Sequence, residues 1–254
     1  MKNKKKIRIK NIILLIAMLF FLGIFIFSTI KIINYLKDNK DNKKIQQTVN
    51  KSIIINEDDS TEEKKYEVDF KSLKEKNPDT VAYLKVEGTN IDYVVVKGNN
   101  NDFYLNHNFN KDYNVSGWIF ADYRNEFNGN DQNIIVYGHN THDNSMFGTL
   151  NKVLEKEWQG KNENHSIVFV TENDASLYQV FSTYKIAPEE YYITTSFKDE
   201  IEYQDYLNKI LSRSNYNYNV SVTKNDKILT LSSCAENGKK RVVLHAKKIE
   251  KSIS

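Results

Sequence analysis

The chain contains a single cysteine in 254 residues, Cys234, and therefore cannot form an intramolecular disulfide. It also begins with an apolar segment typical of membrane insertion, and exported domains usually keep cysteines for disulfides. The usual structural reason for an extracellular cysteine is thus missing. Two interpretations of Cys234 remain open: a reactive thiol, or a buried and inert side chain.

The chain from Tyr66 onward lacks an excess of basic residues. The whole chain carries a net charge of +3, but the first ten residues contribute +6 and residues 31–65 contribute +1, so the remainder carries −4. A mildly acidic domain has no electrostatic footprint for a phosphate backbone, and a nucleic-acid partner is excluded on this ground. The basic N-terminus is explained more simply as a topogenic segment that faces lipid headgroups.

A long uncharged run follows the basic N-terminus. As a helix, the 19 residues after Asn11 would span roughly 28 Å, close to the ~30 Å hydrocarbon core of a bilayer. Because the run ends at Lys31 without an A-x-A-like cleavage site, it predicts an uncleaved signal anchor. Basic residues flank both sides, so charge orients the span weakly. The globular part follows the span, which favours a cytoplasmic N-terminus and an extracellular C-terminus.

Four segments are therefore expected. They are a basic cytoplasmic N-terminus (1–10), a transmembrane signal anchor (11–30), a polar stalk (31–65) and one extracellular domain (66–254). The stalk shows no sustained helical or strand period in its apolar residues, although residues 31–47 can continue the helix for some turns. The domain of about 190 residues is large enough for one hydrophobic core.

Eight runs rich in Val, Ile, Tyr and Phe, many bounded by Asn, Gly or Asp, predict short strands in this domain. They cover residues 81–87, 91–96, 117–121, 133–137, 166–171, 177–186, 227–232 and 241–249. Eight short strands predict a mainly β fold, either a barrel or a sandwich.

Three helices are also expected. The first covers residues 69–76 and stops before Pro78, and the second covers residues 146–154, with four apolar side chains on one face. The third follows Ser196–Asp199, which resembles a capping box, and precedes the strand that leads to Cys234. Its aromatic stripe is expected to pack onto the sheet, and the helix itself to wall a peptide groove.

Several motifs occur in a characteristic order: Asn133–Asn140 (NIIVYGHN), Ser145–Leu150 (SMFGTL), and Thr230–Cys234 (TLSSC) followed by Arg241. Together they resemble sortases, the cysteine transpeptidases with which Gram-positive bacteria attach proteins to the cell wall. The segment from YGHN to SMF and the stretch 188–214 are similar to class B sortases in particular. So are Gly88–Val96 and Asn101–His107. The resemblance covers residues 66 to the C-terminus and implies an eight-stranded barrel, in agreement with the strand count.

Two features depart from the family pattern. Ser233 stands where the family usually has Thr, which keeps the hydroxyl and loses a methyl group. The segment from Cys234 to Arg241 is also short for class B.

The resemblance implies that Cys234, His139 and Arg241 are catalytic. A free cysteine, with a pKa of ~8.5, is mostly protonated at neutral pH, so an imidazole must share or take its proton and return one to the departing amine. A guanidinium can bind the substrate backbone or the developing oxyanion. Each residue also has a plain alternative: His139 as a structural histidine, and Arg241 as a solvated charge in a turn.

Ser232, Ser233 and Glu236 are expected to bind substrate, although Glu236 can equally face water. His139 and His142 form an H-x-x-H pair, but no Cys or Glu cluster accompanies them. Neither a metal nor another cofactor is therefore expected.

The expected function is that of a membrane-anchored enzyme that cleaves a C-terminal sorting motif of exported proteins after Thr. The acyl group would pass through a thioester on Cys234 to an amine of peptidoglycan or of its lipid-linked precursor. The alternatives are a sortase that polymerises pilins, and a non-enzymatic membrane-anchored surface binding module. The Ser-His-Gly-Cys motif of L,D-transpeptidases is absent, and a papain-like hydrolase would place its cysteine before its histidine.

Overall fold

The computed structural model describes residues 2–58, 63–235 and 238–253, and divides into two compact units, Met1–Asp41 and Asn42–Ser254. The first unit consists of helix α1 (Lys2–Val49) up to residue 41. The apolar side chains of the expected span are exposed on this helix. Among the described residues, it is the one helix long and apolar enough to cross a membrane.

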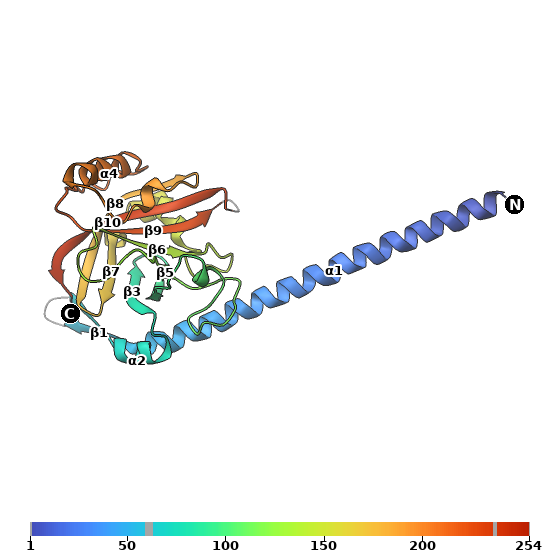
Figure 1. The fold of residues 1–254 in the computed structure, drawn as a ribbon, viewed down its shortest axis with the longest axis horizontal. Coiled ribbons are helices and arrows are strands. Elements are labelled where there is room, and N and C mark those ends of the chain that lie inside the picture. The colour runs from blue at the N-terminus through green and yellow to red at the C-terminus, as the bar shows by residue number, and fades with distance from the viewer. Residues whose placement is uncertain (1, 59–62, 236–237, 254) are drawn as a thin grey trace. The chain divides into compact units, whose positions relative to one another are not determined.

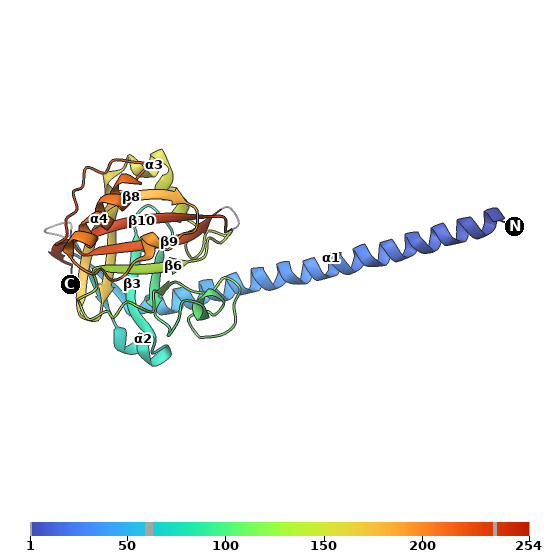
Figure 2. The same cartoon turned by 45° about the horizontal axis from the view of Figure 1, so that its top comes forward.

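The second unit is built on a closed eight-stranded barrel (Figures 1 and 2). Its strands are β3 (Thr80–Val86), β4 (Asp92–Val96), β5 (Phe120–Ala121), β6 (Asn133–Gly138), β7 (Ser166–Thr171), β8 (Asp174–Ile186), β9 (Ile228–Ala235) and β10 (Lys240–Ser252). They neighbour one another in the order β10, β8, β7, β3, β4, β5, β6, β9, and β9 pairs with β10 to close the barrel. All eight predicted strands are thereby confirmed.

The barrel core is formed by alternate residues of each strand. Leu229 and Leu231 of β9, and Val242 and Leu244 of β10, are fully buried in the same apolar cluster. Successive side chains of a strand point to opposite faces, so the residues between them face outward. On β10 these are Val243 and His245, which lie under other elements rather than in water.

The segment expected to be a polar stalk is folded. Helix α1 continues to Val49 and is followed by η1 (Asn50–Ser52) and an antiparallel pair, β1 (Ile53–Asp58) and β2 (Glu63–Val68). The backbone N–H of Tyr66 donates to the carbonyl of Ile253 at 2.7 Å, which ties this pair to the end of β10. The compact unit therefore begins at Asn42, not at Tyr66. The strands were missed because their side chains are mostly polar and show no apolar alternation.

The predicted helix at residues 69–76 is confirmed as α2 (Phe70–Lys76), which Asp69 caps by accepting from the N–H of Ser72 at 3.0 Å. The prediction for residues 146–154 is wrong. Met146 has a φ of 48°, outside the helical region, and only the 3-10 turn η3 (Leu150–Leu154) is regular. The apolar residues there are buried by tight turns that imitate a helical period.

The third predicted helix is confirmed as α4 (Glu200–Ser212), but its cap lies three residues later than expected. The carboxylate of Asp199 accepts from the N–H groups of Ile201 and Glu202. Figure 1 shows α4 lying across the barrel beside β8 and β10. Its buried side chains pack against Phe181 and Ile228, as the aromatic stripe predicted. The remaining short helices are η2 (Phe103–Leu105), α3 (Lys156–Gln159), η4 (Asn162–His165) and η5 (Tyr191–Ile193).

Candidate active site

The barrel topology brings the three predicted catalytic positions to one edge. Strands β6 and β9 are parallel neighbours, with Gly138 opposite Ser233. His139 follows β6 and Cys234 is the penultimate residue of β9, so both lie at the carboxyl ends of these strands. Strand β10 runs antiparallel to β9 and places Arg241 opposite Cys234. The structure describes the backbone of Cys234 but not its side chain, and Glu236 lies outside the described residues.

A cavity of about 490 Å³ opens at this edge. His139, Ser232, Ser233 and Arg241 all line it, so it brings together the predicted site residues whose side chains the structure describes. Its walls are mixed, with apolar and aromatic side chains beside amides and carboxylates. That composition suits a peptide, whose side chains and backbone need both kinds of contact.

Gly138 fixes the backbone immediately before His139. A Cβ atom at this position would lie 2.5 Å from Cδ1 of Ile119 and 2.7 Å from the ring of Phe147. Only glycine allows Phe147 to pack this closely, and the backbone N–H of Phe147 donates to the carbonyl of His139 at 2.9 Å. The turn that carries His139 is therefore held from both sides.

The carbonyl of Leu105 determines which ring nitrogen of His139 is protonated. Nε2 lies 2.7 Å from this oxygen. A carbonyl oxygen only accepts hydrogen bonds, so Nε2 must carry a proton. The lone pair of the neutral ring is then on Nδ1, which becomes the nitrogen available for acid-base chemistry.

Arg241 is held by its own turn. Its Nη1 donates to the carbonyls of Gly238 at 2.8 Å and Lys240 at 3.0 Å. Gly238 has a φ of 85°, a conformation that glycine adopts readily. A guanidinium has five N–H donors, so Nε and Nη2 supply three more for a bound substrate.

The two predicted substrate-binding serines differ in their surroundings. The Ser232 hydroxyl is buried and lies 3.0 Å from the hydroxyl of Tyr192. The Ser233 hydroxyl is also buried, and among the described residues it has no hydrogen-bond partner. An unpaired buried hydroxyl costs about 1–3 kcal/mol, so a polar group that enters the cavity and bonds to it recovers that energy.

A buried carboxylate lies behind the cavity wall. The Asp122 side chain is fully buried and accepts from Arg124 at 2.7 and 2.8 Å and from Tyr137 at 2.8 Å. Burial alone would raise the pKa of Asp122, but these hydrogen bonds hold it below its usual value. Burial and the neighbouring Asp122 raise the pKa of Tyr137. Asp122 is therefore ionised at neutral pH and fixes Tyr137, which lines the cavity.

The sequence missed several lining residues, notably Leu105, Tyr137, Tyr192 and Ile193. Each of them lies in a segment that the resemblance covers, 101–107, 133–140 or 188–214, but nothing within these segments marked the individual residue. The expectation that the helix before β9 walls the groove needs correction. No residue of α4, which the structure describes in full, lines the cavity; the segment Pro188–Ile193 does so instead.

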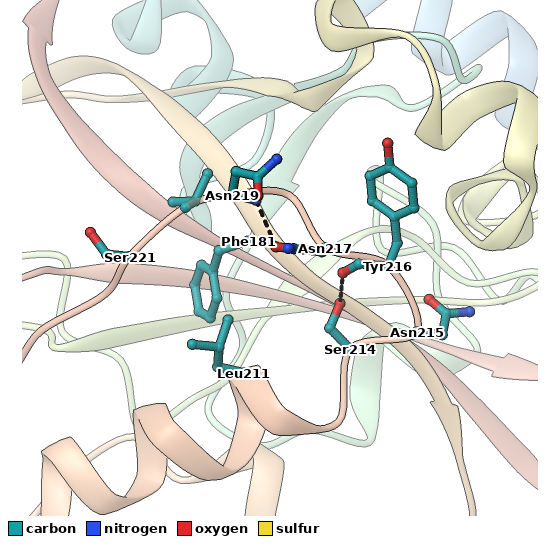
Figure 3. A pocket seen from close by; sticks show the side chains of 9 residues that line it. Phe181, Leu211, Ser214, Asn215, Tyr216, Asn217, Asn219 and Ser221 are labelled. Carbon is teal, nitrogen blue, oxygen red and sulfur yellow. Dashed lines mark hydrogen bonds between the residues drawn. The ribbon is translucent and has the colours of Figure 1, made fainter.

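A second cavity, of about 590 Å³, lies between the end of α4, Phe181 and the loop 214–221 (Figure 3). It is lined largely by amides and hydroxyls, some of which bond within the loop, as Ser214 does to the carbonyl of Tyr216. None of the predicted site residues whose side chains the structure describes lines it. Among the described residues, no group of three or more His, Cys, Asp or Glu side chains could hold a metal.

A closed barrel that carries a cysteine, a histidine and an arginine to the edge of one cavity defines a cysteine-dependent acyl-transfer enzyme. A family model described as the Sortase domain matches residues 84–249. The chain is similar to Sortase B of Listeria monocytogenes, with 34% identity over 237 residues that cover 91% of this chain and 94% of the relative.

Solved structures agree. Sortase B of Clostridium perfringens is 39% identical, with a TM-score of 0.67 over 71% of this chain and 100% of that chain. Sortase B of B. anthracis is 31% identical, with a TM-score of 0.74 over 85% of this chain and 100% of that chain. The chain belongs to the sortase family, the cysteine transpeptidases of cell-wall anchoring, and it resembles the class B members. The non-enzymatic alternative is thereby set aside.

Proposed function

We propose that this sortase is a single-pass membrane protein that cleaves a C-terminal sorting motif of exported proteins after Thr. It then transfers the new acyl end to an amine of peptidoglycan or of its lipid-linked precursor. The observation that carries the proposal is the shared cavity, in which His139 and Arg241 flank the strand end that bears Cys234.

The chemistry proceeds in two acyl transfers. The thiolate of Cys234 attacks the carbonyl carbon of the substrate threonine, and the C–N bond after it breaks when His139 delivers a proton to the departing amine. The acceptor amine then attacks the thioester carbon, its proton passes to the base, and the thiolate leaves. Both steps need one group that alternates between acid and base, and the Nδ1 of His139 can serve this role.

Arg241 and the serines have supporting roles in this proposal. The N–H groups of the guanidinium bind the substrate backbone or the oxyanion of each tetrahedral intermediate. The hydroxyl of Ser233, which has no partner among the described residues, supplies a hydrogen bond to the bound peptide. Ser232 acts indirectly, because its hydroxyl holds Tyr192 against β9. Glu236, just beyond the cysteine, is retained as a substrate-binding candidate.

The class B resemblance supports a pentapeptide of the Asn-Pro-Gln-Thr-Asn or Ser-Pro-x-Thr-Gly type as substrate. A short extended peptide of this kind can be accommodated by the mixed lining of a cavity of about 490 Å³. Mass spectrometry of the cleavage products from a library of such peptides identifies the preferred motif. Supplying different amines in the same reactions separates a wall acceptor from a pilin lysine.

The nucleophile is tested with Cys234→Ala. We expect this variant to keep the fold, because the substitution removes only the sulfur atom of one residue near the end of β9, and to lose peptide cleavage completely. Wild-type protein should accumulate a thioester with the substrate threonine when no amine is present, visible as a mass increase of the intact protein. Residual turnover by the purified alanine variant would contradict the assignment.

A further inference from the structure

Three consecutive backbone carbonyls beside the active-site cavity are each held by a side chain from another part of the fold. The Tyr206 hydroxyl donates to the carbonyl of Tyr192, Arg124 Nη2 donates to that of Ile193, and Asn133 Nδ2 donates to that of Thr194. Each of the three distances is 2.8 Å. The donors come from α4, from the segment after β5 and from β6, and Tyr192 and Ile193 line the cavity.

This segment has weak internal support. It is the single 3-10 turn η5, and its backbone bonds, from the N–H groups of Ile193 and Thr194, are long at 3.2 and 3.4 Å. One shorter internal bond, at 2.8 Å, runs from the Thr194 hydroxyl to the carbonyl of Tyr191. A turn of this length has little stability by itself. Its position therefore depends on contacts outside it, which are the buried packing of Tyr192 against Tyr184 and Val243 and the three donors to its carbonyls.

The donors are themselves anchored in buried polar groups. Arg124 binds the buried carboxylate of Asp122 through Nε and Nη2. The guanidinium that donates to the carbonyl of Ile193 is therefore held in place by Asp122. Asn133 is fully buried, and its Nδ2 also donates to the Tyr206 hydroxyl at 3.1 Å. Two of the three donors are thus linked to each other.

A series of hydrogen bonds leads from Asn133 to Thr230, His245 and Tyr184, and the carbonyl of Thr194 determines which group donates in each of them. Because that oxygen only accepts, the amide nitrogen of Asn133 must face it, and Oδ1 must accept from the Thr230 hydroxyl at 2.7 Å. The Thr230 oxygen then accepts from Nδ1–H of His245 at 2.8 Å. Nε2 of His245 in turn accepts from the Tyr184 hydroxyl at 2.8 Å. A neutral His245 in one tautomer satisfies the whole series.

We propose that Tyr206, Arg124 and Asn133 are positioning residues that hold the backbone of Tyr192–Thr194 as a preformed wall of the peptide site. Because the wall is ordered before the peptide arrives, binding does not have to order it. The wall also reaches β9 two residues before Cys234, through the contact between the hydroxyls of Tyr192 and Ser232. This inference rests on the proposed function, since it assigns the cavity to the sorting peptide.

Tyr206→Phe tests the inference, and Tyr203→Phe is the matched control. Both tyrosines lie on α4 and are buried to within 2% exposure, but the Tyr203 hydroxyl bonds to the carbonyls of Gln132 and Asp226, away from the cavity. The hydrogen bond to the carbonyl of Tyr192 is worth about 0.5–1.5 kcal/mol, so KM for the sorting peptide should rise roughly two- to twelvefold in Tyr206→Phe with little change in kcat. Alkylation of Cys234 by iodoacetamide should keep its wild-type rate.

Hydrogen exchange provides a readout that does not depend on activity. The amides of Ile193 and Thr194 should exchange faster in Tyr206→Phe than in wild type or Tyr203→Phe. Arg124→Lys keeps a positive charge beside Asp122 but loses the planar guanidinium that binds Asp122 and Ile193 together. It should show faster exchange of the Ile193 and Thr194 amides and a higher KM, as Tyr206→Phe does. An unchanged KM and unchanged exchange in Tyr206→Phe, or equal changes in Tyr203→Phe, would overturn the inference. If wild type cleaves no sorting peptide, the proposed function fails, while the exchange comparison still decides whether the wall is held as we propose.

Discussion

At the scale of single residues, the site depends on how each reactive group is oriented before substrate arrives. The Leu105 carbonyl selects one tautomer of His139, and the turn at Gly238 and Lys240 holds Arg241. These contacts use backbone carbonyls, which every residue type provides. Substitution of Leu105 itself would therefore change the cavity lining more than the tautomer.

His139→Ala and Arg241→Ala should each lower kcat by at least ~10²-fold, as losses of acid-base and oxyanion groups usually do. Steady-state cleavage of a sorting peptide measures both constants. A change confined to KM would instead assign the residue to substrate positioning. Arg241→Lys is a useful comparison, because it keeps the charge and loses the planar donors.

His245 makes the stability of the domain depend on pH. Burial, with a further contribution from the positive charge of Arg213, lowers its pKa to about 3. In the unfolded chain a histidine titrates near 6.5, so between pH ~6.5 and ~3 the unfolded state binds more protons than the folded state. The free energy of unfolding should therefore fall on acidification by up to about 1.4 kcal/mol per pH unit from this group.

Urea unfolding of wild type and His245→Gln at pH 7, 6 and 5 measures this dependence. Glutamine does not titrate, so the free energy of unfolding of the variant should depend less steeply on pH than that of wild type, whatever its stability at pH 7. Equal slopes in the two proteins would show that His245 is not kept neutral by the fold.

At the scale of elements, the segment Pro188–Ile193 and helix α4 have different relations to the substrate. The segment lines the cavity, whereas α4 packs on the barrel and supports the segment from behind through Tyr206. Helix α4, which precedes β9 in the chain, thus affects the site only through the segment that it supports. Its exposed face, which includes Ile201 at 73% exposure, is free to vary without changing the cavity.

Exchange of Pro188–Ile193 for the corresponding residues of another sortase class should change which pentapeptide is cleaved. Ile201→Ser on the outer face of α4 should leave selectivity and rate unchanged. Competition between peptides of a mixed library, followed by mass spectrometry, compares the two variants directly. Unaltered selectivity after the exchange, in a folded protein, would mean that other walls of the cavity choose the substrate.

At the scale of the whole molecule, an apolar helix precedes an acidic barrel. The run to Ile30 is long enough to cross a bilayer, and sortases are membrane-associated enzymes of the cell wall. A single-pass protein with an extracellular domain would meet exported substrates and wall amines on the same side. Its second compact unit begins at Asn42, so residues 31–41 of α1 are the chain between that unit and the proposed span.

Protease shaving of intact protoplasts should release a domain that begins between residues 37 and 42, because the chain from Asn42 onward belongs to the compact unit. The control is the same treatment after lysis of the membrane. Protection of the domain until lysis would reverse the orientation, and secretion of a soluble form would show that the apolar run is a cleaved signal peptide.

Local patterns were sufficient for much of the fold. The eight barrel strands were predicted because apolar and β-branched residues mark each one within a few positions. Two helices were predicted because the stop before Pro78 and the apolar stripe before β9 are local signals. The β1–β2 pair and the turns at residues 146–154 were mispredicted for the opposite reason. The mostly polar side chains of β1 and β2 give no apolar period, and the tight turns at residues 146–154 imitate a helical one.

The sequence by itself determined the family and the proposed catalytic residues: a lone cysteine, with a histidine 95 residues before it and an arginine after it, in the order of one enzyme family. Only the tertiary structure decided how these groups meet, because the parallel pairing of β6 with β9 joins segments that have no local signal for each other. It also decided that Leu105 orients His139, and that α4 supports the wall at Tyr192 rather than forming it. Hydrogen bonds between distant residues specify these features, and such bonds leave no periodic trace in a sequence.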